Sequence, residues 1–291
     1  YEGRDLDVFL GIPYAQPPIG DLRFKKPLPL DRKWEQPLDA QHWPPACYHN
    51  KYHQDYFNHN MSEDCLYLNI WSPVNTKSTG ALKPVMFWIH GGGFVWGSSV
   101  EKFYSGEVLS ALGDVVVVTI NYRLNIFGLL YTGAEGPAPG NMALWDQSVA
   151  LEWVVDNIRY FGGDPQRVTI FGESAGAFSV AAHILSPISR NLFTNAILMS
   201  GAPLNDRLIT PRDEREREGV EKAVSLGCGV STDGKFTPEL IDCLMGQPPE
   251  KLVQEFTLDV ESSVIDIIVD GEFLPESPKE MLKSGNFKKG L

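Results

Sequence analysis

The chain has 291 residues, of which 43% are hydrophobic and 11% aromatic, so it can bury a sizeable core and is not expected to be disordered. That length suits either one large α/β domain or two small ones. The formal net charge of −12 argues against nucleic acid or an anionic membrane surface as a partner. No apolar run approaches the ~18–20 residues of a membrane span, so no spanning segment is expected.

Strand-like and helix-like segments alternate along most of the chain. In chain order, the sequence predicts strands at residues 8–10, 66–71 and 84–89, a helix at 103–112, a strand at 115–122, a helix at 141–160, a strand at 168–171, a helix at 177–185 and a strand at 195–199. Asn141 is expected to cap its helix. Charged helices at 212–226, 238–244 and 249–256 are expected to lie over the sheet without a catalytic role. The alternation predicts an α/β fold with a mostly parallel, doubly wound sheet.

Residues 168–180 read VTIFGESAGAFSV, which places a G-x-S-x-G pattern between a predicted strand and a predicted helix. In that context the pattern is the nucleophile elbow, a sharp turn that presents the serine Oγ above the sheet. Glycines flank the turn because a Cβ would collide where strand and helix crowd together. The free N–H groups that begin the helix favour negative charge near the reacting carbon. We therefore predict that Ser174 is a catalytic nucleophile rather than part of a structural turn.

A second glycine motif follows the strand predicted at residues 84–89. The run His90-Gly91-Gly92-Gly93 comes next, and three consecutive glycines let the backbone approach a substrate and direct its N–H groups inward. Acyl transfer develops an oxyanion, which positioned backbone donors stabilise by about 3–4 kcal/mol each. We predict an oxyanion hole formed by the N–H groups of Gly92, Gly93 and Ala175.

The four cysteines, Cys47, Cys65, Cys228 and Cys243, fall into two local pairs. Four cysteines allow three connectivities, of which pairing between sequence neighbours is the simplest. The alternative is a zinc site around Cys47 and the histidines at 42, 49, 53 and 59, but their spacing fits no zinc pattern, and we expect no metal and no other cofactor. The glycosylation sequon at Asn60 agrees with paired cysteines in indicating a secretory route.

Six sequence blocks carry a resemblance to a known family. They are FLGIPYA (9–15), SEDCLYLN (62–69), WIHGGGF (88–94), NYR (121–123), FGGDP (161–165) and FGESAG (171–176). In this order they span essentially the whole chain, which resembles the carboxylesterase type B group that includes the cholinesterases. The resemblance implies the α/β-hydrolase fold, in one domain that includes residues 1–291. It also implies a serine hydrolase of small-molecule esters that is extracellular or lies in the secretory pathway.

The resemblance further implies roles for individual residues. It pairs Cys47 with Cys65 and Cys228 with Cys243 as disulfides. It predicts buried ion pairs between Arg23 and Glu63 and between Arg123 and Asp146. Glu173, beside the nucleophile, would be a carboxylate that supports the site without reacting itself.

Two departures from the cholinesterases concern the choice of substrate. In cholinesterases a tryptophan ahead of the SEDC block stacks on the quaternary ammonium group, whereas residues 54–60 here contain only Tyr56 and Phe57 as aromatic residues. The acyl-pocket tryptophan of cholinesterases is likewise missing from residues 204–208. We therefore expect a general carboxylesterase, with an acetylcholinesterase-like choline esterase as the alternative.

The acid and the histidine of the family's triad both follow the serine in sequence. Residues 270–275 and 286–289 resemble the segment ahead of the acid, so both groups are expected beyond Leu291. His90 belongs to the glycine loop and His183 to the helix after the serine, so neither is assigned as the base. Both chain ends read as cuts in a longer protein, and this fragment by itself is expected to be inactive.

An alternative function of a different class is a cholinesterase-like adhesion or binding domain that has lost catalysis. Ser174 together with an intact Gly92-Gly93 loop disfavours that alternative, because a binding domain needs neither. The sequence gives no indication of the oligomeric state.

Overall fold

The computed structural model describes residues 3–31, 34–49, 60–74, 81–204, 209–257 and 267–291. A six-stranded sheet forms the centre of this structure, with strands in the order β1-β4-β6-β5-β7-β8. The strands are β1 (Leu6–Pro13), β4 (Tyr67–Pro73), β5 (Lys83–Ile89), β6 (Val116–Ile120), β7 (Gly163–Glu173) and β8 (Asn195–Met199). Strands β6, β5, β7 and β8 pair in parallel, whereas β1 and β4 are antiparallel at one edge. The predicted mostly parallel sheet is confirmed.

The register of β5 and β7 brings the two glycine motifs together. Trp88 lies opposite Phe171, and Ile89 lies opposite Gly172. Because parallel strands end at the same edge of a sheet, the glycine loop after β5 and the turn after β7 emerge side by side. The candidate site is therefore placed by strand pairing between segments about 80 residues apart in the sequence.

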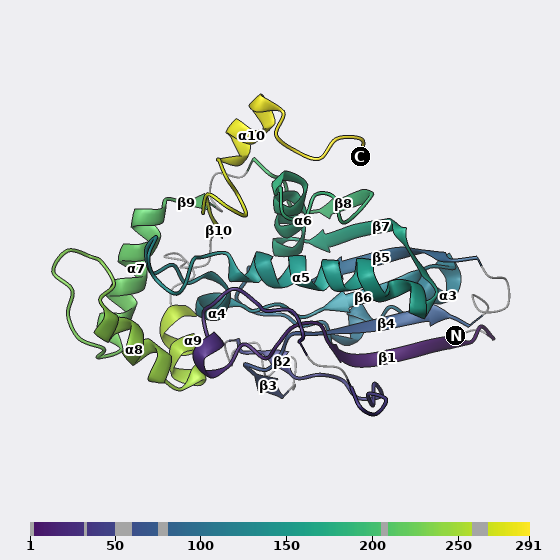
Figure 1. Cartoon of the computed structure of the whole chain (residues 1–291), viewed down its shortest axis with the longest axis horizontal. Helices are drawn as coiled ribbons and strands as arrows, with labels where there is room; N and C mark the ends of the chain where they lie inside the picture. Colours follow the sequence, from purple (N-terminus) through teal and green to yellow (C-terminus); the bar gives the residue numbers. More distant parts are fainter. Residues whose placement is uncertain (1–2, 32–33, 50–59, 75–80, 205–208, 258–266) are drawn as a thin grey trace.

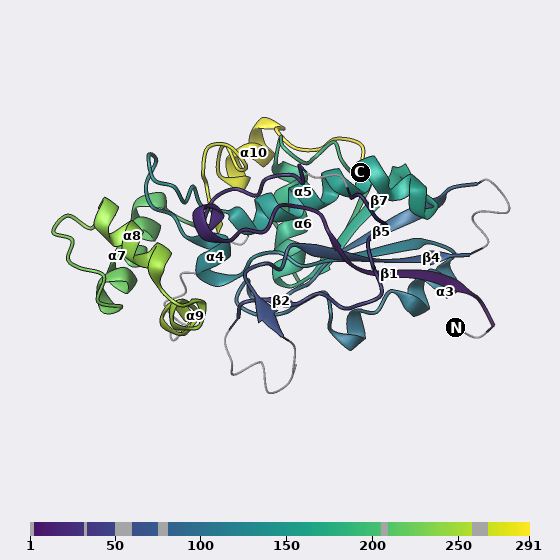
Figure 2. The same ribbon diagram turned by 60° about the horizontal axis from the view of Figure 1, so that its bottom comes forward.

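Helices cover both faces of the sheet. Helix α3 (Glu107–Gly113) lies on the opposite side of the sheet from α5 (Met142–Asn157), as Figure 2 shows. Helix α6 (Ala175–Leu185) follows β7 directly and packs against it, against β8 and against α5. All five residues of β6 are buried, which is typical of a parallel strand covered on both faces. The doubly wound arrangement is thus confirmed as well.

The charged helices after β8 form a separate group at one end of the molecule (Figure 1). These are α7 (Arg212–Ser225), α8 (Pro238–Gly246) and α9 (Pro249–Thr257), and together with α4 (Asn125–Leu129) they share a second hydrophobic cluster. The other elements are η1 (Gly20–Leu22), β2 (Ala46–Cys47), β3 (Met61–Ser62), η2 (Lys102–Tyr104), η3 (Ile158–Phe161), β9 (Ile209–Thr210), β10 (Ile267–Ile268) and α10 (Pro278–Ser284).

Two local predictions are wrong in detail. The helix predicted at residues 103–112 is split into η2 and α3 at Ser105, whose ψ of 126° is not helical. Asn141 stands at the N-cap position of α5 but makes no side-chain cap. Its amide instead exchanges two hydrogen bonds with the backbone of Ile268, at 2.8 and 2.9 Å. At Asn141 a contact with a distant segment therefore replaces the local cap.

Both cysteine pairs form disulfides in the simplest connectivity. Cys47 pairs with Cys65 and Cys228 with Cys243, with Cα–Cα distances of 5.0 and 5.4 Å. The first bridge joins β2 to the segment before β4, and the second joins the loop after α7 to α8. Each therefore closes a short local loop.

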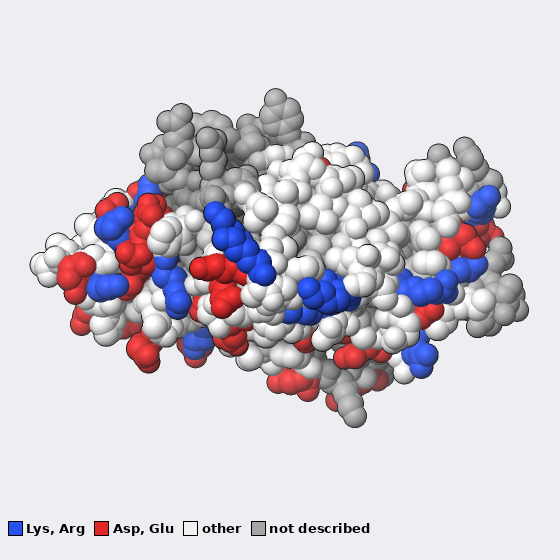
Figure 3. Space-filling view, turned by 90° about the horizontal axis from the view of Figure 1, so that it is seen from above, with Lys and Arg blue, Asp and Glu red and all other residues white. Residues whose placement is uncertain are grey.

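Acidic and basic side chains are intermixed on the described part of the face shown in Figure 3. That face therefore shows no broad area of a single sign of the kind that attracts a polyanion. Of the helices that the structure describes, none is long and apolar enough to cross a bilayer.

Candidate active site

Ser174 occupies the sharp turn between β7 and α6, as predicted. Its φ of +52° and ψ of −119° lie in a region that residues other than glycine rarely adopt. The turn is held from both sides, since the Ser174 N–H donates to Met199 O at 2.9 Å and Ser174 O accepts from Phe178 N at 3.0 Å. Such strain at one residue persists only where the surrounding structure fixes it, and it clusters at functional positions.

The glycines on either side of Ser174 are required by close contacts. A Cβ on Gly172 would lie 2.5 Å from Gly176 C, and a Cβ on Gly176 would lie 2.1 Å from Ile89 O. Strand β5, the end of β7 and the start of α6 therefore touch backbone to backbone at this point. The packing argument made from the sequence holds for both glycines.

The glycine loop after β5 lies against the turn that carries Ser174. A Cβ on Gly91 would lie 3.4 Å from Ser174 Cβ and 2.9 Å from Glu173 Oε2. Gly92 and Gly93 follow with φ of +103° and +61°, which side-chain-bearing residues rarely adopt. Among the described residues, the N–H groups of Gly92, Gly93 and Ala175 donate to no other group. An oxyanion hole requires N–H groups that are free in this way to donate to a bound oxyanion.

His90 is a structural residue beneath the glycine loop. Its ring stacks on Tyr122 at 4.3 Å, and its carbonyl oxygen accepts from the Tyr122 hydroxyl at 2.7 Å. Burial lowers the pKa of the His90 imidazole to about 4. The ring is thus neutral at physiological pH and serves to position the loop.

The His183 side chain, on α6, likewise forms its hydrogen bonds with groups other than Ser174. Its Nδ1 lies 2.7 Å from Ser189 Oγ and its Nε2 lies 3.0 Å from Gln147 Oε1. The Gln147 amide nitrogen contacts Ser179, which leaves its oxygen to accept from His183 Nε2–H. Burial lowers the pKa of His183 to about 3. Neither His90 nor His183 can therefore act as a base on Ser174.

Two groups behind the glycine loop were missed by the sequence analysis. Glu101 is only 1% exposed, and burial raises the pKa of its carboxyl to about 7. The Tyr104 hydroxyl faces the Gly91 backbone, and burial together with the charges of Glu173 and Glu101 raises its pKa to about 12. The Tyr104 ring packs on Trp88 with centroids 5.0 Å apart. A glutamate in the run SSVEKFYS reads as a surface residue, so no sequence signal indicated its burial.

The two ion pairs implied by the family resemblance are present and shielded from solvent. The Arg123 side chain donates two hydrogen bonds to Asp146, at 2.7 and 2.8 Å, and the two side chains are 3% and 0% exposed. Arg23 pairs with Glu63 and also donates to the carbonyl oxygens of Met245 and Gln247 at 2.8 Å. The first pair joins the segment after β6 to α5. The second joins the segment after η1 to the residues between β3 and β4, and the carbonyl contacts of Arg23 join the same segment to the end of α8.

The other predicted positions are surface features or lie outside the described residues. Asn60 is exposed, immediately before β3. Residues 54–59 and 205–208, which contain most of the two departures from the cholinesterases, lie outside the part of the chain that the structure describes. Within the described part, no three His, Cys, Asp or Glu side chains come together in a group that could hold a metal ion.

The carboxylesterase family model matches residues 1–290. The chain belongs to the carboxylesterase family. Its six-stranded, mostly parallel sheet with helices on both faces is the α/β-hydrolase fold of that family.

Several relatives in the carboxylesterase family are similar over almost the whole chain. The acetylcholinesterase of Electrophorus electricus is 45% identical over 96% of this chain and 45% of its own length. The acetylcholinesterase of Bungarus fasciatus is 42% identical over 97% of this chain and 48% of its own. The cholinesterase of Mus musculus is 41% identical over 99% of this chain and 49% of its own. The chain spans about half the length of these curated relatives.

Proposed function

We propose that the protein containing this chain is a serine hydrolase of carboxylic esters that works through an acyl-enzyme on Ser174. The observation that carries the proposal is the strained turn at Ser174, held between β7 and α6 with the glycine loop directly against it. Membership of the carboxylesterase family supports the same reaction. In such a site the serine Oγ is exposed to substrate at the carboxyl edge of the sheet.

In the proposed reaction, Ser174 Oγ attacks the ester carbonyl carbon and its proton passes to a general base. The carbonyl oxygen becomes an oxyanion, which the N–H groups of Gly92, Gly93 and Ala175 would stabilise. Collapse of this intermediate expels the alcohol and leaves an acyl-enzyme, which water then hydrolyses. Glu173, next to Ser174 and close to Gly91, would add negative charge beside the site without taking part in bond making.

None of the histidines in the part of the chain that the structure describes is placed to act as the base on Ser174. Each histidine in the described residues makes its polar contacts with groups other than Ser174. A serine hydroxyl is a weak nucleophile without a base. We therefore propose that residues 1–291 alone do not turn over esters, and that the triad acid and histidine belong to chain beyond Leu291.

For the substrate, we propose a general carboxylic ester rather than a choline ester. The proposal rests on the absence of tryptophan from residues 54–60 and 204–208. The relatives named acetylcholinesterase and cholinesterase favour the alternative, a choline ester. A non-catalytic binding domain is the remaining alternative, and the retained strain at Ser174 argues against it.

For the cellular location, we propose the secretory pathway. Two disulfides are typical of oxidising compartments, and the exposed Asn60 would be accessible for glycosylation. A mobility shift of the secreted protein on glycosidase treatment, abolished by Asn60→Gln, would support this location.

Hydrolysis of p-nitrophenyl acetate by the protein at its natural full length tests the proposed activity. We expect Ser174→Ala to lower kcat by a factor on the order of a million, as loss of the nucleophile does in a serine protease. Ser186→Ala, a change of the same size just beyond the other end of α6, serves as the matched control. Equal activity in Ser174→Ala and Ser186→Ala would refute the assignment.

A further inference from the structure

The glycine loop is hydrogen-bonded at both ends to the segment that follows β6. His90 O, directly ahead of the three glycines, accepts from the Tyr122 hydroxyl at 2.7 Å. Phe94 O, directly after them, accepts from the Asn125 N–H at 2.7 Å. The three glycines therefore lie between two points that are both fixed by one short segment.

That segment is itself held firmly in place. Arg123 donates three hydrogen bonds to Asp146 on α5. The Asn121 side chain accepts from the Ser99 N–H at 2.9 Å and donates to Pro45 O at 2.9 Å. A contact from this segment can therefore set the position of the glycine loop rather than follow it.

Tyr122 supports two consecutive carbonyl groups at the start of the loop. Its hydroxyl holds His90 O directly, and its ring stacks on the His90 imidazole with centroids 4.3 Å apart. The imidazole Nδ1 lies 2.8 Å from Gly91 O, and because a carbonyl oxygen only accepts, Nδ1 carries the proton and donates. Burial raises the pKa of the Tyr122 hydroxyl well above its usual value, so this group also stays protonated and donates.

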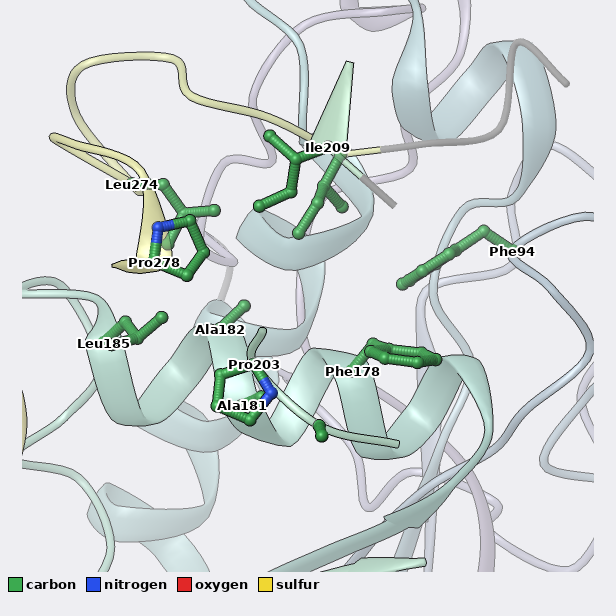
Figure 4. A pocket seen from close by; sticks show the side chains of 11 residues that line it. Phe94, Phe178, Ala181, Ala182, Leu185, Pro203, Ile209, Leu274 and Pro278 are labelled. Carbon is green, nitrogen blue, oxygen red and sulfur yellow. The ribbon is translucent and has the colours of Figure 1, made fainter. Parts of the chain in front are cut away.

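Phe94, at the other end of the loop, also contacts Tyr122. The two rings lie edge to face, with centroids 6.3 Å apart. Phe94 and Phe178 of α6 line the same small apolar pocket (Figure 4). This end of the loop is thus set between Tyr122 and the helix that begins directly after Ser174.

We propose that Tyr122 is a positioning residue of the oxyanion hole, whose hydroxyl acts through His90 O to set the direction of the N–H groups in the glycine loop. The inference rests on the proposed ester hydrolysis and deepens it. Oxyanion donors are effective at about 2.7–3.1 Å from the oxygen, and a misplacement of about 1 Å costs on the order of a hundredfold in rate. Because the neutral ester depends on these donors less than the oxyanion does, loss of the hydroxyl should lower kcat and leave KM almost unchanged.

Tyr14 provides a matched control. Its hydroxyl donates to Asn121 O at 2.7 Å, and the Tyr14 and Tyr122 side chains are 1% and 0% exposed. Tyr14→Phe and Tyr122→Phe each remove one buried hydroxyl and leave one backbone carbonyl oxygen without this donor. Only the oxygen affected in Tyr122→Phe belongs to the glycine loop, so only this variant should change the reaction.

The test measures kcat and KM of the full-length protein and both variants for p-nitrophenyl acetate. It also measures Ki for a trifluoromethyl ketone, whose adduct with the serine carries the oxyanion. We expect Tyr122→Phe to lower kcat by about 10- to 100-fold and to weaken the inhibitor by the same factor, with KM within about twofold of the wild type. Tyr14→Phe should stay within about twofold of the wild type in all three quantities. Partial unfolding would lower the apparent kcat without weakening the inhibitor, so a shared shift identifies a defect in the folded site.

Hydrogen exchange reads the state of the loop without relying on turnover. The N–H groups of Val95 and Trp96 donate to Gly92 O at 3.0 and 3.1 Å, so their exchange reports how well the loop is held. We expect residues 90–97 to exchange at least about tenfold faster in Tyr122→Phe than in the wild type. The same residues should exchange at the wild-type rate in the control variant.

The two measurements separate failure of this inference from failure of the proposed activity. Faster exchange confined to Tyr122→Phe, in a protein that turns over no ester, would retain the support of the loop and refute the activity. Ester hydrolysis with equal kcat and equal Ki in Tyr122→Phe and Tyr14→Phe would overturn the role of Tyr122, as would unchanged exchange at residues 90–97. If Tyr122→Phe does not fold, replacement of Tyr122 by 4-fluorophenylalanine, which fills more of the hydroxyl's space but cannot donate, is measured in its place with the same expectation.

Discussion

Arg123 lies just after β6 and donates hydrogen bonds to Asp146 on α5 from both its side chain and its backbone. Two guanidinium nitrogens and the Arg123 N–H donate to the Asp146 carboxylate, at 2.7, 2.8 and 3.0 Å. Both side chains are almost completely shielded from solvent. The pair therefore holds the segment after β6 against α5. Strand β6 in turn pairs with β5, the strand that leads into the glycine loop.

Removing the carboxylate charge from this pair should destabilise the fold strongly. Asp146→Asn leaves the buried Arg123 cation without its counter-charge, and we expect the free energy of unfolding to fall by about 3–5 kcal/mol. Asp164→Asn is the matched control, because Asp164 pairs with Arg167, which is 51% exposed. An exposed pair contributes less than about 1 kcal/mol. Urea unfolding measures both variants, and equal losses would contradict the structural role given to Arg123.

The disulfide between Cys228 and Cys243 should stabilise the helical group beside the sheet. Replacing both cysteines by serine frees a loop with a sequence separation of 15 residues. We expect the free energy of unfolding to fall by about 3 kcal/mol, the cost that the chain-entropy model gives for a loop of this size. Chemical denaturation of the oxidised protein and the double variant measures the difference. Identical midpoints would show that the bridge adds no stability.

Stability should fall in mild acid because His183 is buried as the neutral imidazole. Its pKa is lowered to about 3 in the folded state, against 6.5 for the exposed group. Between these values the unfolded chain binds more protons, so stability is lost as the pH falls below about 6.5. From pH 7 to pH 5 this residue should account for about 2 kcal/mol.

The variant His183→Gln tests this assignment, since an amide cannot take up the proton. We expect the variant to be less stable at pH 7.5 but to lose less further stability than the wild type between pH 7 and pH 5. His90, with its pKa lowered to about 4, remains in the variant and keeps part of the acid sensitivity. The same pH dependence in both proteins would place the titrating group elsewhere.

The full-length protein should gain little from a quaternary ammonium group in its substrate. A desolvated cation–π contact is worth about 2 kcal/mol or more, equivalent to roughly thirtyfold in specificity. No tryptophan in residues 54–60 is present to supply it. The measurement compares kcat/KM for acetylcholine and its uncharged isostere, 3,3-dimethylbutyl acetate. A preference of thirtyfold or more for acetylcholine would favour the choline esterase over the general esterase.

The sequence predicted the site best where local pattern and tertiary packing agree. Apolar β-strand runs that end in glycine motifs identified the ends of β5 and β7, and strand pairing brings these ends together. Gly172 and Gly176 could be explained in advance because the need for a missing Cβ is local to the turn. The pairing of the buried ions was predicted from the family resemblance alone. Nothing in the sequence around Arg123 or Asp146 shows that these two side chains lie next to each other in the fold.

The sequence failed where a distant segment decides the local structure. Asparagine is a common residue at helix N-caps, yet the Asn141 side-chain amide forms its hydrogen bonds with the backbone of Ile268, more than a hundred residues away. Glu101 is only 1% exposed, although the polar residues around it in the sequence indicate a surface position. Ile267 and Leu274 line a small apolar pocket with Phe178 and Leu185 of α6 (Figure 4), and their position beside that helix is a property of the folded chain. Such contacts cannot be read from spacing or propensity.

Covalent labelling tests the central claim most directly. The full-length protein is treated with a serine-directed fluorophosphonate, digested, and mapped by mass spectrometry, with the Ser174→Ala variant treated in parallel. The account predicts one phosphonylated residue, Ser174, with loss of ester hydrolysis in proportion to labelling and no label in the variant. Labelling at a different serine, or hydrolysis that persists when Ser174 is fully modified, would contradict it.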